Sequence, residues 1–155
     1  MGKRQGRKAV HRHLRQPNTL PMGKQELAMS QNSPEELYDL DCESRYDFTL
    51  SQVAEERELW ILVNQNNEFL KIYSEDEAFE YLPVWPSETL ATFYAKGEAD
   101  LEAKCISLPK FLKDWVPGLT KDKLEIGVFP GLDATVWVTE AEDFRNDIQQ
   151  ELANL

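Results

Sequence analysis

Large apolar side chains are sparse in the first 24 residues and recur at regular spacings only from Arg45 onward. All four tryptophans and all seven phenylalanines lie in residues 45–155. A segment without such side chains cannot bury enough apolar surface to offset the chain entropy that is lost on folding. We therefore expect a largely disordered extension and linker over residues 1–44, and one folded domain over residues 45–155, a length typical of a single domain.

Within residues 45–155, apolar residues follow helical spacing in some stretches and form short β-branched or aromatic runs in others. In chain order, the pattern predicts a helix (45–58), three strands (59–63, 68–73 and 78–85), a helix (87–96), a strand (104–108), a helix (109–116), two strands (124–129 and 134–139) and a final helix from about residue 140. We interpret the first three strands as an antiparallel meander. Pro130-Gly131-Leu132-Asp133, between the last two strands, has the composition of a turn.

This order of elements predicts an α+β fold. The expected architecture is a single compact domain with an antiparallel or mixed sheet of about five to six strands and about four helices packed on it. Two local sequence signals mark helix boundaries. Pro117-Gly118 is expected to end the third helix, and residues 139–142 have the composition of a capping box for the last helix.

Residues 30–44 precede the domain and are acidic. Ser33-Pro34-Glu35-Glu36 is a typical helix start, with serine as the cap, proline in the first position and acids in the first turn. This stretch is therefore either an acidic linker or one short helix, which could dock on the domain or stay loose.

Charge divides the chain into two parts. Residues 1–24 hold seven basic and no acidic side chains, whereas residues 25–155 hold 10 basic and 28 acidic ones, which gives the net charge of −11. The basic segment could contact nucleic acid phosphates, remain a solvated arm, or be an extension absent from the natural product, since Met22 and Met29 offer later starts. Nucleic-acid binding is therefore expected only through residues 1–24.

Metal and cofactor sites are not expected. His11 and His13 could ligate a metal, but no third ligand lies near them. The two cysteines, Cys42 and Cys105, are far apart and belong to no metal or disulfide motif, which is typical of a reducing compartment. Cys105 lies in an apolar run and is expected to be a small buried hydrophobe.

The apolar runs are too short for a membrane-spanning helix. The run from Leu59 to Val63 is far shorter than the roughly 20 residues that a membrane span needs. No apolar segment of a secretory signal follows the basic start. We therefore expect a cytoplasmic protein.

Catalytic motifs are scarce. No histidine follows His13, so residues 14–155 contain no imidazole base, and the chain has no phosphate-binding GxxxxGK[ST] or GxGxxG loop. Most carboxylates lie in first helical turns or polar runs, where a solvated face is the ordinary role. We favour a protein without enzymatic activity. The alternative is a hydrolase or transferase that uses carboxylates without histidine.

Two segments combine tryptophan with proline. Trp85 precedes Pro86 at a strand-to-helix junction, and Trp115 lies two residues before Pro117 at a helix end. One interpretation is that the prolines stiffen junctions while the tryptophans fill the core. The other is that Trp85, Pro86, Trp115 and Pro117 line a surface groove for a peptide or another protein.

These segments also carry a resemblance to a known family. Residues 45–155 resemble the short bacterial proteins grouped as domain of unknown function 2750. The matching motifs are Arg45-Tyr46, the Trp60 strand, Leu82-Pro83-Val84-Trp85-Pro86, the helix with Phe111, Trp115 and Pro117, and Gly127-Val128-Phe129-Pro130. The resemblance implies a small bacterial cytoplasmic domain with no established activity and supplies no catalytic residue.

The resemblance leaves residues 1–28 outside, which favours their interpretation as an extension. Together, these observations lead to the hypothesis of a non-enzymatic, acidic interaction or regulatory domain of the bacterial cytoplasm. Its partner is expected to be another protein or a peptide. The sequence leaves the oligomeric state open.

Overall fold

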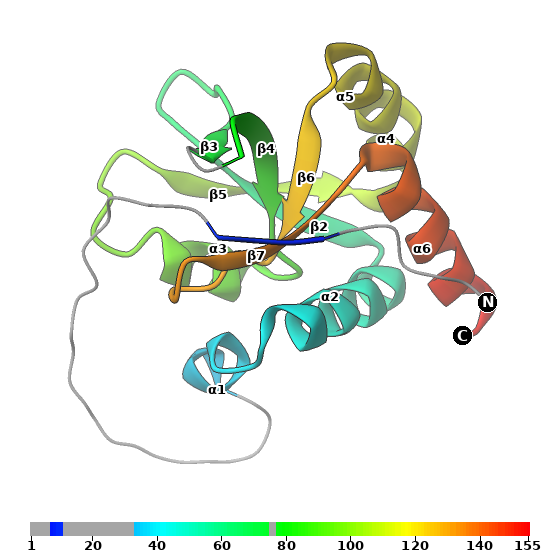
Figure 1. Ribbon diagram of the computed structural model, residues 1–155, viewed down its shortest axis with the longest axis horizontal. Helices are drawn as coiled ribbons and strands as arrows, with labels where there is room; N and C mark the ends of the chain where they lie inside the picture. Colours follow the sequence, from blue (N-terminus) through cyan, green and yellow to red (C-terminus); the bar gives the residue numbers. More distant parts are fainter. Residues whose placement is uncertain (1–6, 11–32, 75–76) are drawn as a thin grey trace.

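Two sheets and the helices packed on them make up the part of the chain that the computed structural model describes, residues 7–10, 33–74 and 77–155 (Figure 1). The strands are β1 (Arg7–Val10), β2 (Glu58–Val63), β3 (Ile72–Ser74), β4 (Phe79–Val84), β5 (Glu102–Ser107), β6 (Glu125–Val128) and β7 (Thr135–Thr139). The helices are α1 (Pro34–Tyr38), α2 (Cys42–Glu56), α3 (Glu88–Tyr94), α4 (Leu108–Lys110), α5 (Val116–Asp122) and α6 (Ala141–Ala153), with a π-helical turn, η1 (Phe111–Trp115), between α4 and α5. None of the described helices is both long and apolar enough to span a bilayer.

The larger sheet has the strand order β1-β7-β6-β4-β3. Its β4 and β6 are parallel and its other neighbours antiparallel, so the sheet is mixed. A second, antiparallel sheet pairs β2 with β5. Reciprocal backbone hydrogen bonds between Trp60 and Trp85 (2.9 and 2.8 Å) join β2 to the end of β4. The predicted α+β class is confirmed, and so is the predicted order of elements from the first long helix to the last.

The predicted meander forms only in part at its first strand. The end of β2 pairs antiparallel with the start of the predicted second strand, through a bridge between Val63 and Phe69 and a hydrogen bond from the Leu70 amide to the Leu62 carbonyl oxygen (2.9 Å). Over its whole length, however, β2 pairs with β5 and not with β3. Residues on both faces of β2 are buried, including Leu59, Ile61 and Leu62. A strand buried on both faces needs cover on both sides, which a position inside the domain supplies and a position in an exposed hairpin does not.

The packed region begins earlier than Arg45. Ser33 caps α1 in a capping box with Glu36, and Asp41 caps α2 by accepting a hydrogen bond from the Ser44 amide (2.8 Å). Tyr38 is buried and donates its hydroxyl to the carbonyl oxygen of Leu90 in α3 (2.7 Å). The expected boundary between residues 44 and 45 therefore falls inside α2, and the acidic stretch forms a helix that docks.

Of the first 32 residues, the structure describes residues 7–10. Residues 7–10 form β1 at the edge of the larger sheet, which a disordered extension would not do. Residues 1–6 and 11–32, including His11 and His13, lie outside the described residues.

Two helix-boundary predictions are wrong. The helix expected to end at Pro117-Gly118 continues through both residues to Asp122. The wider π-helical turn before Val116 explains this, because proline lacks the amide hydrogen that a regular α-helix requires and its ring needs extra space. The capping box expected at residues 139–142 does not form, since Glu140 is the N-cap and makes no side-chain cap hydrogen bond.

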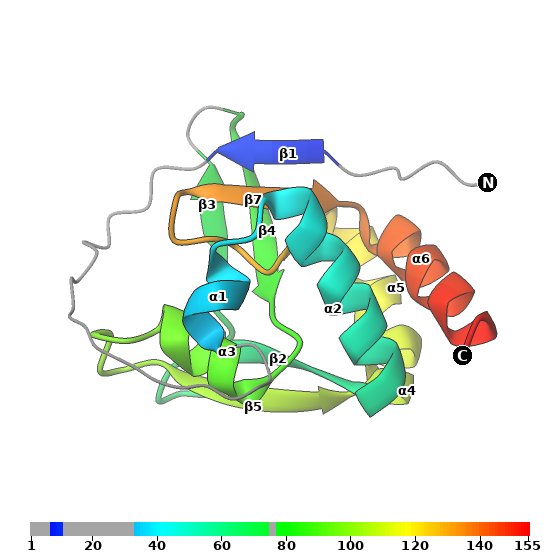
Figure 2. The same cartoon turned by 90° about the horizontal axis from the view of Figure 1, so that it is seen from below.

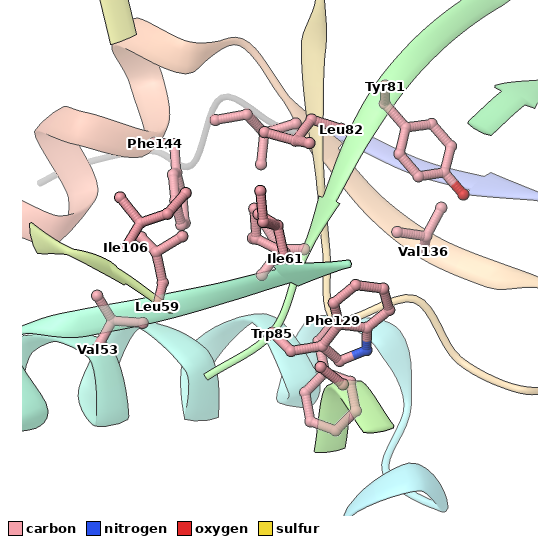
Figure 3. Packing of buried hydrophobic residues seen from close by; sticks show 14 of the residues in the cluster. Val53, Leu59, Ile61, Tyr81, Leu82, Trp85, Ile106, Phe129, Val136 and Phe144 are labelled. Carbon is pink, nitrogen blue, oxygen red and sulfur yellow. The ribbon is translucent and has the colours of Figure 1, made fainter. Parts of the chain in front are cut away.

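The core lies between the larger sheet, the β2–β5 pair and helices α2, α3 and α6. Figure 2 shows α2 and α6 side by side, and both helices contact the larger sheet. In the core view, Leu59 and Ile106 of the small sheet lie beside Phe144 of α6, and Trp85 lies beside Phe129 (Figure 3). Helix α2 joins this core through Tyr46, whose ring contacts Trp137 of β7 and Phe144.

Close packing between β4 and β6 leads to a test of stability. A Cβ atom at Gly127 would lie 2.2 Å from the Tyr81 ring, whereas a Cβ at Gly118 in α5 would meet nothing within 4 Å. We expect Gly127→Ala to lower the free energy of unfolding by about 1–3 kcal/mol through overpacking. The control, Gly118→Ala, should raise it by roughly 0.5–1 kcal/mol because alanine favours a helix. Urea denaturation of both variants measures this, and equal effects would contradict the packing described here.

Candidate functional site

A buried arginine holds together three segments that are far apart in the sequence. Arg45 lies in the first turn of α2, and 0% of its surface is exposed. Its Nε donates to the carbonyl oxygen of Phe129 (2.9 Å), and its Nη1 donates to that of Leu40. Its Nη2 donates to the carbonyl oxygen (2.9 Å) and Oγ1 (3.0 Å) of Thr135. Arg45 thus ties the turn before α2 to both ends of the segment that leads from β6 into the first residue of β7, residues 129–135, which we call the Arg45 loop.

Carbonyl oxygens compensate most of the buried charge. A guanidinium stays protonated in proteins, so its donors must find acceptors when it leaves water. Burial lowers the pKa of Arg45, and the carboxylate of Asp133 raises it in part. Oδ1 of Asp133 lies 3.9 Å from Nη2, but this side chain is 62% exposed, so the ion pair is weak. The main partners of Arg45 are therefore backbone atoms, which makes it a structural clamp on the loop.

The Arg45 loop has a strained backbone. Phe129 (φ 52°) and Ala134 (φ 70°) both adopt the left-handed conformation, which costs a non-glycine residue about 1 kcal/mol or more. Asp133 stabilises the loop by accepting hydrogen bonds from the amide (3.0 Å) and hydroxyl (2.7 Å) of Thr135. Gly131 donates its amide to the Thr135 carbonyl oxygen (2.8 Å). These hydrogen bonds therefore hold the loop in a backbone conformation that its residues would not favour alone.

The tip of the loop is exposed although its base is buried. A Cβ atom at Gly131 would lie 2.5 Å from Nη2 of Arg45, so glycine is required for the close approach of the loop to the guanidinium. Pro130 and Gly131 are buried, whereas 54% of the Leu132 surface is exposed. A fixed loop with an apolar side chain at its tip can serve as a contact point for a partner.

The predicted groove residues do not come together. Trp85 (0% exposed) and Pro86 are buried, and the Trp85 ring packs against Tyr94 of α3 (5.1 Å between centroids). Neither can line a surface, so their assignment to an interaction surface is wrong. Trp85 belongs instead to the buried core cluster, where Figure 3 draws it together with Phe129. The other interpretation, that Trp85 fills the core, agrees with its burial.

Trp115 and Pro117 lie elsewhere, on the helical segment α4–η1–α5. Trp115 is half-buried and contacts Phe69 (5.5 Å between centroids) and Phe111 (6.5 Å), and Pro117 is exposed. An interaction role for these two residues stays a prediction, without Trp85 and Pro86 as companions.

Cys105 is exposed, contrary to the expectation of burial. It lies on β5, the outer strand of the small sheet, directly opposite Trp60. Desolvation and the neighbouring carboxylate of Glu58, whose Oε1 is 3.5 Å from Sγ, raise the pKa of this thiol. A raised pKa lowers the fraction of thiolate, which is the nucleophilic form of cysteine.

The sequence predictions missed Arg45, Leu132 and Asp133. A charged residue in the first turn of a helix is usually solvated, and nothing in its neighbours marked Arg45 as buried. The Pro130-Gly131-Leu132-Asp133 turn was identified only as a turn. No group of three or more histidine, cysteine, aspartate or glutamate side chains in the described ranges is arranged to hold a metal ion.

Removing the Arg45 side chain tests the clamp. Arg45→Met leaves buried carbonyl oxygens without donors, so we expect the free energy of unfolding to fall by about 3 kcal/mol or more. Arg145 of α6 is the matched control, because its contact with Glu142 (2.6 Å) is a partly exposed pair within one helix. Arg145→Met should cost less than about 1 kcal/mol. Chemical denaturation measures both values, and a similar loss in both variants would exclude a special role for Arg45.

Asp133 predicts a dependence of stability on pH. Desolvation alone would raise the pKa of Asp133, but the hydrogen bonds from Thr135 and the charge of Arg45 outweigh it and lower the pKa overall. A lowered pKa in the folded state means that the carboxylate stabilises the fold above its unfolded pKa of about 3.9, and that this contribution is lost as the pH falls through the folded pKa.

We therefore expect Asp133→Asn to be less stable than the wild type at neutral pH, with a difference that shrinks below about pH 4. Unfolding in urea at several pH values measures this difference. Asp122→Asn, at the exposed end of α5, controls for the loss of one negative charge. A difference for Asp133→Asn that is constant across the pH range would contradict the prediction.

Comparison with known proteins found one family model that matches the chain from the residue after Arg45 into α6. The family model described as a protein of unknown function (DUF2750) matches residues 46–148, which include β7 and the entire Arg45 loop. No curated protein matches the chain. Since the match spans more than half of the sequence and agrees with the resemblance of residues 45–155, the chain belongs to the DUF2750 family.

Proposed function

We propose that this protein is a non-enzymatic interaction domain of the bacterial cytoplasm, and that it contacts a partner protein through the tip of the Arg45 loop. One observation carries the proposal. A buried arginine holds a strained loop whose tip exposes an apolar side chain, Leu132.

The conformational strain of the Arg45 loop and the burial of a charge beneath it support a role beyond joining two strands. Two strands can be joined by a short glycine-containing turn at little cost, whereas this loop has two left-handed non-glycine residues, Phe129 and Ala134, and a buried guanidinium. Strain of this kind concentrates at functional sites. A loop that is already ordered loses less conformational entropy on binding, so its contacts contribute more fully to affinity.

Charge and composition are consistent with the proposed class of protein. Residues 33–155 contain 10 basic and 27 acidic side chains, a formal charge of −17, which attracts basic surfaces and speeds their encounter. The absence of histidine from residues 14–155 removes the commonest acid–base catalyst and supports a binding role. The bacterial cytoplasmic setting is supported by the family resemblance and by the low cysteine content, two residues that lie far apart in the sequence.

Site-specific photo-crosslinking in the native cells tests the proposal. A photoreactive amino acid replaces Leu132, and the control carries it at Tyr73 of β3, which is exposed to nearly the same extent (53% against 54%). We expect a discrete crosslinked species from position 132 and none from position 73. Adding Asp133→Asn, which retains an acceptor for Thr135, should preserve the crosslink, while adding Arg45→Met should weaken it. Equal crosslinking from positions 132 and 73, or none from either, would refute the proposal.

A further inference from the structure

The outer edge of β7 is covered by a strand from the opposite end of the chain. β1 pairs antiparallel with β7, with Arg7 opposite Val138 and Val10 opposite Thr135. Figure 2 shows β1 along the outside of the sheet, beyond β7. Residues 11–32 separate this strand from the rest of the described chain, so β1 reaches its place from a distant part of the sequence.

β7, which would end the larger sheet if β1 were absent, differs from the edge strands β3 and β5. Exposed edges are usually protected against pairing by shortness, charge or proline. β3 has three residues, and β5 has the exposed charged residues Glu102 and Lys104. The sequence of β7, Thr-Val-Trp-Val-Thr, is composed of strong strand formers and has no charge, proline or glycine. Without β1, it would be an unprotected edge, which is suited to accept another strand.

β1 and β7 belong to parts of the chain that have opposite charge, and only β7 lies within the residues that match the family. Residues 1–24 carry seven basic and no acidic side chains, whereas residues 33–155 have a formal charge of −17. The family match from residue 46 to residue 148 contains β7 but not β1. The acceptor edge thus belongs to the family domain, and its occupant comes from a segment outside the match.

We propose that the outer edge of β7 is a docking site for an extended basic peptide strand, and that residues 7–10 are its built-in ligand. Backbone hydrogen bonds supply the affinity, as in other cases where a peptide adds a strand to a sheet, and the opposite charges of peptide and domain assist the encounter. The proposal does not depend on the Arg45 loop, because it rests on strand pairing alone.

The test uses a variant of the full chain in which β1, the proposed ligand, no longer pairs with the edge of β7. Amide groups in an edge strand alternate between pointing toward the neighbouring strand and away from it, so at least one of two consecutive prolines removes a ladder hydrogen bond. The double variant Ala9→Pro/Val10→Pro therefore releases β1 without a change of charge. A labelled peptide with the sequence of residues 3–14 is then titrated into this variant and into the wild type, and fluorescence anisotropy is measured. The control peptide contains the same two prolines and has the same charge.

We expect the natural peptide to bind the double variant at least about tenfold more tightly than the wild type, whose edge is already occupied. We also expect it to bind the double variant at least about tenfold more tightly than the control peptide does. Equal binding of the two peptides would show attraction by charge only and would overturn the proposal, as would equal binding to the two proteins or no binding. Amide hydrogen exchange in the wild type gives an independent measurement. The outward amides of β7 should be protected, and rapid exchange there would also overturn the proposal.

Discussion

The burial of the Arg45 guanidinium is the constraint on which the arrangement around β7 depends. A charge that leaves water must be matched by acceptors at hydrogen-bond distance, or its desolvation destabilises the fold. Here the acceptors are Leu40, Phe129 and Thr135, which lie before α2, after β6 and at the start of β7. These three segments cannot move independently, since a shift of any one would leave part of the charge unpaired.

The same constraint explains the shape of the loop. A carbonyl oxygen can reach a buried guanidinium only where the backbone turns inward, and the left-handed conformations of Phe129 and Ala134 lie at the two ends of that turn. The favourable contacts of Arg45 and Asp133 offset the local strain. Leu132 is exposed as a result, because the loop bends its base into the protein and its tip away from it.

The parts of the fold that local patterns determine could be predicted, and those that depend on distant contacts could not. Apolar spacing predicted the order of helices and strands, and residues 130–133 were identified as a turn. The pairing of β2 with β5 was missed, because the local sequence of a strand indicates that it is a strand but not which other strand it pairs with. Helix α5 continues through Pro117 because of a π-helical turn, which depends on packing. The site was missed for a similar reason: the role of Arg45 depends on carbonyl groups up to 90 residues away. Tryptophan and proline suggested a groove, but Trp85 fills the core.

The two surfaces considered for binding meet at one residue. Thr135 accepts hydrogen bonds from Arg45 through its carbonyl oxygen and its hydroxyl, and it is the residue of β7 that lies opposite Val10 of β1. A strand on the edge of β7 therefore pairs with the position that anchors the Arg45 loop. The contact of Arg45 with Thr135 fixes β7 at the end that adjoins the Arg45 loop, whereas β1 pairs along the strand from Thr135 to Val138 through the backbone. The two surfaces are therefore neighbours on one strand, but each is held by its own contacts.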